Sequence, residues 1–86
     1  MTATADDAVS TLWATAWLQL RVVFPDIESR LAQLEHTRPT KARALARLEA
    51  SAGRAAGRCL RGTAKPIELL KRLWAWQAAV LAEVEK

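Results

Sequence analysis

Hydrophobic residues recur along the chain at intervals of three and four positions, and three proline-centred breaks interrupt this pattern. Such spacing predicts amphipathic α-helices, and no segment shows the alternation typical of a β-strand. The prolines at positions 25, 39 and 66 divide the chain into four predicted helices, over about residues 6–24, 25–36, 41–61 and 66–85. Gly62 stands where a helix-ending glycine adopts a left-handed conformation. The sequence therefore predicts an all-α protein, a compact bundle of three or four helices forming one domain over residues 1–86.

The apolar faces of the predicted helices differ in size. The face of the third helix is mostly small, with Leu45, Leu48, Ala52, Ala55, Ala56 and Cys59. The face of the fourth helix covers about half of its circumference, so we expect it to contact two or more neighbours. Gln77 lies within that apolar arc. It either fixes the register or the oligomeric state, or it faces a polar gap at a helix crossing.

Some apolar residues lie away from these main faces. Leu18 and Val22, four positions apart, form a second apolar spot on the first helix, and Trp74 and Trp76 lie at opposite margins of the apolar arc of the fourth. These spots are either covered within the monomer or form an interface. A chain of 86 residues with one cysteine depends on helix packing or self-association for stability. We therefore expect a homodimer, and we take Leu18, Val22 and Trp76 as candidate interface residues.

Charge is distributed unevenly along the chain, which carries a net charge of +4. The formal charge is −3 over residues 1–37, +8 over residues 38–72 and −1 over residues 73–86. Such asymmetry indicates an anionic partner. The longest uncharged run, over residues 8–20, is too short to span a bilayer. A peripheral binder of anionic membranes is a further possibility, but the third predicted helix lacks the large apolar residues that a surface-lying helix would insert, so we expect no membrane partner. The lone cysteine and the acidic start of the chain favour a cytoplasmic protein.

Five arginines share one side of the third predicted helix and are called here the arginine row: Arg43, Arg47, Arg54, Arg58 and Arg61. Their spacing places them within an arc of about 60° and along roughly 27 Å of helix. Lys41 and Lys65 add charge near its two ends. Like charges four positions apart repel, so the helix loses some stability by presenting this row. Because guanidinium groups bind phosphate oxygens bidentately, the row could follow a nucleic-acid backbone largely without regard to sequence.

Three interpretations of the arginine row are open. It binds phosphates of DNA or RNA, or it docks onto an acidic protein surface as part of an adaptor or inhibitor. Alternatively, it is merely solvated or paired internally with acidic residues such as Asp26, Glu28 and Glu35. A GC-rich genome would also favour arginine and alanine. We take a non-catalytic nucleic-acid-binding accessory protein as the first hypothesis and the protein interaction module as its alternative.

Residues suited to catalysis or metal binding are few. Cys59 is the only cysteine and His36 the only histidine. Cys59 falls on the small apolar face of its helix, so we expect it to be buried. There is no paired-carboxylate, triad or metal-ligand pattern. We therefore expect no enzyme activity, no metal and no cofactor.

Overall fold

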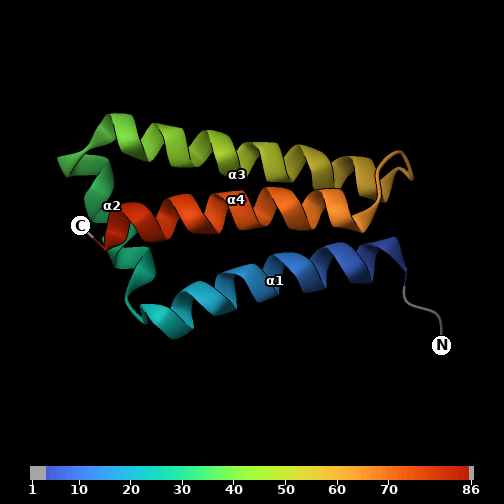
Figure 1. Cartoon of the computed structure of the whole chain (residues 1–86), viewed down its shortest axis with the longest axis horizontal. Helices are drawn as coiled ribbons and strands as arrows, with labels where there is room; N and C mark the ends of the chain where they lie inside the picture. Colours follow the sequence, from blue (N-terminus) through green and yellow to red (C-terminus); the bar gives the residue numbers. More distant parts are fainter. Residues whose placement is uncertain (1–3, 86) are drawn as a thin grey trace.

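The structure, a computed structural model, describes residues 4–85, and this part of the chain folds into four α-helices (Figure 1). Their bounds are Ala5–Val23 for α1, Ile27–Thr37 for α2, Pro39–Leu60 for α3 and Pro66–Val84 for α4. The long helix α4 lies between α3 and α1, and the short α2 closes one end. The molecule measures 44 × 24 × 15 Å. The predicted all-α bundle is confirmed, with four helices in the described part of the chain.

Two helix starts differ from the predicted ones. Helix α2 begins at Ile27 rather than at Pro25. Phe24 is extended, as is usual for a residue before proline, and the Ile27 N–H donates a hydrogen bond to the Phe24 carbonyl (2.9 Å), which makes a turn of the residues between them. Helix α3 begins at Pro39, two residues earlier than expected. Proline has no backbone N–H, and the first position of a helix does not need one, because no carbonyl precedes it in the helix to accept the hydrogen bond.

A capping box that the sequence analysis did not identify starts α1. The Thr4 hydroxyl accepts a hydrogen bond from the Asp7 N–H (3.2 Å), and the Asp7 carboxylate accepts one from the Thr4 N–H (3.3 Å). This reciprocal pair satisfies backbone donors that the first helical turn leaves free.

Gly62 ends α3 as predicted. Its φ is +78°, in the left-handed region that glycine adopts without strain. The Gly62 N–H donates to the Cys59 carbonyl (3.1 Å) and the Thr63 N–H to the Arg58 carbonyl (2.9 Å), the hydrogen bonds of a Schellman motif. The chain thereby reverses within a few residues and lays α4 antiparallel along α3.

The centre of the core is the contact between a small face of α3 and a large face of α4. All of these side chains are buried: Ala52, Ala55, Ala56 and Cys59 on α3, and Leu69, Leu73, Trp76 and Val80 on α4. Small side chains on one helix allow the other to approach closely and to fill the space with its own large ones. The Cys59 thiol donates to the Lys65 carbonyl (3.4 Å), so its predicted burial on this face is confirmed.

Trp76, a predicted interface residue, is instead part of this core. It is 2% exposed and packs edge-to-face against Trp17 of α1, with ring centroids 4.8 Å apart. The interface prediction for Trp76 is therefore wrong, because α1 and α3 together cover the side of α4 on which it lies. Trp74, two residues earlier, is 55% exposed and is the tryptophan that α4 presents at the surface.

Gln77 joins α4 to α1. Its side-chain amide donates to the Ala16 carbonyl (2.9 Å) and to the Gln19 side-chain oxygen (2.8 Å). A polar contact at the edge of an apolar interface favours one relative position of two helices, because a shift would break its hydrogen bonds. Of the two roles considered for Gln77, the structure therefore shows the first: Gln77 fixes the register of α1 against α4 within one chain.

The two neighbouring tryptophans of α4 should differ sharply in their contribution to stability. We expect Trp76→Ala to lower the free energy of unfolding by about 3–5 kcal/mol through the cavity it leaves. Trp74→Ala should cost less than about 1 kcal/mol in dilute protein, because more than half of that side chain is already in water. Urea denaturation followed by far-ultraviolet circular dichroism measures both, and equal losses would contradict this packing.

Candidate functional site

The arginine row lies on the outer side of α3, opposite the small face that packs on α4. Four of its members are exposed, and Arg58 is partly buried. Lys41 and Lys65 are also exposed near the two ends of the row. Burial of the alanine and cysteine face therefore fixes the rotation of α3 and turns the arginines outward.

Ion pairing divides the nine arginines of the chain into two groups. Five have a carboxylate within 4 Å: Arg21, Arg30, Arg38, Arg58 and Arg72. The remaining four have no such partner among residues 4–85: Arg43, Arg47, Arg54 and Arg61. All four belong to α3 or to the residue that ends it. The fold thus leaves four of the five members of the arginine row available to an external anion, and Arg58 is the member that is paired.

Two of the acidic residues considered as internal partners of the row are engaged elsewhere. Asp26 pairs with Arg30 (2.9 Å), and Glu28 pairs with Arg21 (2.6 Å). The hydrogen bond from Arg30 holds the pKa of the Asp26 carboxyl below its ordinary value. Internal pairing of the row through these two carboxylates is therefore excluded by the structure.

The third of these acidic residues, Glu35, lies at the edge of the row. It shares a shallow hollow between α2 and α3 with Arg43, together with Pro39, Ala42 and Ala46. The two charged groups do not come within the 4 Å of an ion pair. Glu35 therefore lowers the positive potential near Arg43 without occupying its guanidinium.

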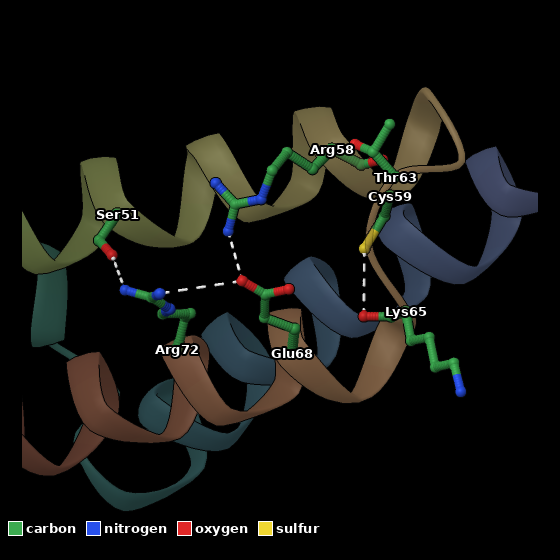
Figure 2. Close-up of polar contacts among 7 residues, drawn as sticks. All are labelled: Ser51, Arg58, Cys59, Thr63, Lys65, Glu68 and Arg72. Carbon is green, nitrogen blue, oxygen red and sulfur yellow. Dashed lines mark hydrogen bonds and ion pairs between the residues drawn. The ribbon is translucent and has the colours of Figure 1, made fainter.

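One member of the row is paired, and its partner comes from α4 (Figure 2). Arg58 Nη2 donates to Glu68 Oε1 at 2.5 Å, and Arg72 Nη2 lies 3.8 Å from the same oxygen. Arg72 Nη1 also donates to the Ser51 hydroxyl at 2.8 Å. A single carboxylate thus lies between two guanidinium groups from two helices, so this cluster keeps a net positive charge.

Arg72 is a basic residue that the sequence analysis did not assign to the site. Its hydrogen bond to Ser51 places it against the flank of α3, next to the arginine row. We call the arginine row together with Arg72 the basic face. In Figure 2 the α3–α4 contacts of this face lie in front, and α1 lies behind the two helices. No local pattern could have identified Arg72, because only the register of α3 against α4 brings it to the row.

The residues between the arginines are small. Ala46, Ala50 and Gly53 are exposed, and Gly57 is partly exposed. A methyl group added at the Gly53 Cα would meet nothing within 4 Å, so the surface there is open. Leu60, 49% exposed at the end of α3, is the one large apolar side chain exposed on this helix. The surface between the arginines is therefore low, and a long anion can approach it closely.

Other kinds of site find little support in the described part of the chain. Residues 4–85 contain no cluster of three or more histidine, cysteine, aspartate or glutamate side chains that could hold a metal ion. None of the four helices is long and apolar enough to cross a membrane. Comparison with protein families, with curated proteins and with solved structures finds no match to this chain.

Reversing the charge of two neighbouring arginines on the basic face should change stability in opposite directions. Arg54→Glu replaces a repulsive pair with Arg58 by an attractive one, so we expect a gain of a few tenths of a kcal/mol. Arg58→Glu breaks the pair with Glu68 and sets two carboxylates against each other, so we expect a loss of about 1 kcal/mol. Chemical denaturation at low salt measures both. A loss for Arg54→Glu as large as that for Arg58→Glu would show that Arg54 has an internal partner.

Proposed function

We propose that the protein is a non-catalytic nucleic-acid-binding accessory protein that binds the phosphate backbone of a duplex through the basic face. One observation carries this proposal: the arginines without an ion-pair partner among residues 4–85 all lie along the outer side of α3. A row roughly 27 Å long supplies several guanidinium forks to successive phosphates. The row costs stability through repulsion, which an external polyanion would relieve.

Contacts with phosphate, rather than with bases, account best for these residues. The arginine row contains no asparagine or glutamine that could recognise adenine, and Ser51 is already bonded to Arg72. Contacts to phosphate position a protein on nucleic acid but carry no sequence information. Binding should therefore depend on charge and on the shape of the backbone.

A duplex fits this surface better than a single strand does. Proteins that hold single strands combine basic grooves with aromatic side chains on which bases stack. Helix α3 carries no aromatic residue, and Trp74 lies on the part of α4 that shares a hollow with Leu12 and Thr15 of α1. The tryptophan and the arginine row therefore cannot contact the same stretch of strand.

An acidic protein partner is the alternative function. Protein interfaces draw most of their affinity from buried aromatic, apolar and arginine anchors. Around the arginine row the exposed neighbours are alanines and glycines, and Leu60 alone could serve as an apolar anchor on this helix. This composition favours a uniform polyanion over a shaped protein surface.

The proposal is tested by titrating the protein into labelled duplex DNA, duplex RNA and single-stranded RNA at two salt concentrations. We expect salt-dependent binding to duplexes that falls about 100-fold between 50 and 200 mM salt if about four phosphates are contacted. The variant Arg43→Gln, Arg47→Gln, Arg54→Gln should lose most of this affinity, since it removes three of the free guanidinium groups.

A matched control removes three positive charges outside α3, by Arg21→Gln, Arg30→Gln and Lys71→Gln. It should bind nearly as the parent protein does if the arginine row is the contact surface. Equal loss in the two triple variants would show that only net charge matters. Absence of duplex binding at about 50 mM salt would overturn the proposal and leave the acidic protein partner as the better explanation.

Removing the carboxylate from the basic face should strengthen binding. Glu68→Gln frees Arg58 and Arg72, so we expect several-fold higher affinity for a duplex and a steeper salt dependence by about one phosphate contact. Glu28→Gln raises net charge equally but frees Arg21 on α1, away from the basic face. Fluorescence anisotropy compares the two. An equal gain in both variants would contradict a role for the cluster around Glu68.

A further inference from the structure

The exposed surface of the bundle has two parts of opposite character. On the outer side of α1, Leu18 and Val22 are 59% and 74% exposed, and the dimer interface expected at them stays a prediction. On α3 and the adjoining flank of α4, by contrast, arginines lie close to one another, and contacts within the chain hold several of them in place.

Positive charge is concentrated in the C-terminal half of the basic face. Four arginines lie there and are called here the C-terminal cluster: Arg54, Arg58, Arg61 and Arg72. Among residues 4–85, Glu68 is the one carboxylate within 4 Å of them, so four positive groups and one negative group give a net charge of +3. The N-terminal half of the row has Arg43 and Arg47. Beside them Glu35 and Glu49 line one hollow between α2 and α3, which lowers the positive potential there.

Gly57 gives room to the guanidinium group of Arg61. A Cβ built on Gly57 would lie 3.3 Å from Arg61 Nη1 and 4.0 Å from both Cζ and Nη2. The Arg61 side chain therefore runs back along α3 and covers the glycine, where any larger residue at position 57 would displace it. At Gly53, the other glycine within α3, a built Cβ meets nothing within 4 Å.

Two more guanidinium groups of the C-terminal cluster are held by contacts between α3 and α4 (Figure 2). Arg58 donates to Glu68 (2.5 Å), and Arg72 donates to the Ser51 hydroxyl (2.8 Å). A guanidinium group has five N–H donors, so both arginines keep donors for an external acceptor. Side chains that are already held in place lose less conformational freedom when an anion binds.

We propose that the C-terminal cluster is a site for one doubly charged phosphate group, the monoester at the end of a nucleic-acid strand. A phosphate monoester carries a charge of about −1.5 to −2 at pH 7, whereas each backbone phosphate carries about −1. A site with a net charge of +3 therefore favours the monoester. Arg47 and Arg43 lie about 15 and 21 Å from Gly57 along α3, where they would follow the backbone that leads away from the strand end. The strand end as the source of the phosphate rests on the proposed function, since a small phosphate monoester in solution has the same chemistry.

A short duplex with and without 5′-phosphates tests the strand end. About 10 base pairs suffice, because the row covers roughly eight steps of 3.4 Å. We expect the phosphorylated duplex to bind about 10-fold more tightly than the same duplex with 5′-hydroxyl ends, as measured by fluorescence anisotropy. Arg61→Gln should remove most of this preference. Arg43→Gln is the matched control: it should weaken binding of both duplexes and leave their ratio unchanged.

The two glycines of α3 test the position of the Arg61 guanidinium group. Gly57→Leu fills the space that this group occupies, so we expect the preference for the phosphorylated duplex to fall several-fold. Gly53→Leu adds the same side chain where no neighbour lies within 4 Å and should leave the preference intact. Both variants replace a helical glycine and should raise Tm by a few degrees, so a loss of folding does not explain a difference between them.

Titration calorimetry with methyl phosphate and dimethyl phosphate, without nucleic acid, tests the site by itself. We expect methyl phosphate to bind with a Kd on the order of 1 mM and dimethyl phosphate at least about 10-fold more weakly. Binding of methyl phosphate that Arg61→Gln abolishes, with equal binding of the two duplexes, would support the site and assign a small phosphate monoester as its ligand.

Two results overturn the proposal. One is equal binding of the two duplexes together with no binding of methyl phosphate. The other is a preference for the phosphorylated duplex that Arg61→Gln leaves intact. Failure of the proposed function gives a different result, the absence of binding to either duplex, and calorimetry with methyl phosphate then decides whether the site exists.

Discussion

The packing of α3 on α4 is the contact on which the other features depend. Alanines and a cysteine form the inner side of α3, so the leucines and Trp76 of α4 can fill the space beside it. This burial fixes how α3 is rotated about its axis, and that rotation turns the arginine row to solvent. The same register sets Glu68 and Arg72 beside Arg58 and Ser51. The core and the basic face are thus two sides of one helix–helix contact.

Stability and surface charge oppose each other on α3. Arginines four positions apart repel, and positive charge near the start of the helix is unfavourable to the helix dipole. Elsewhere the chain reduces such repulsion by pairing, as in Arg21–Glu28 and Arg38–Glu83. On α3 the opposing contribution is burial of the inner face, together with the Schellman motif at Gly62. Four arginines of the row lack an ion-pair partner among residues 4–85 despite this energetic cost, and this is the main physical reason to propose a role in binding for the row.

Helix α4 separates two surfaces of different chemistry. The basic face includes its flank toward α3, and the exposed Trp74 lies on its flank toward α1. Gln77 holds α1 against α4 by donating hydrogen bonds to the Ala16 carbonyl and the Gln19 side chain. This contact helps to determine which side of α1 faces solvent. Because the two flanks do not overlap, an anion bound at the basic face would leave Trp74 exposed.

The amino-acid sequence by itself determined the features that arise from neighbouring residues. Prolines and Gly62 marked the helix breaks to within two residues, and helical periodicity placed the five arginines on one side and Cys59 on the other. Tertiary structure decided which neighbours cover each helix. It buried Trp76 rather than Trp74, paired Arg58 with Glu68, and brought Arg72 to the row. Helical periodicity defines the angle at which each side chain projects from the axis of its own helix. Which side chains face a neighbouring helix depends on contacts between residues far apart in the chain. A local sequence pattern carries no information about such contacts.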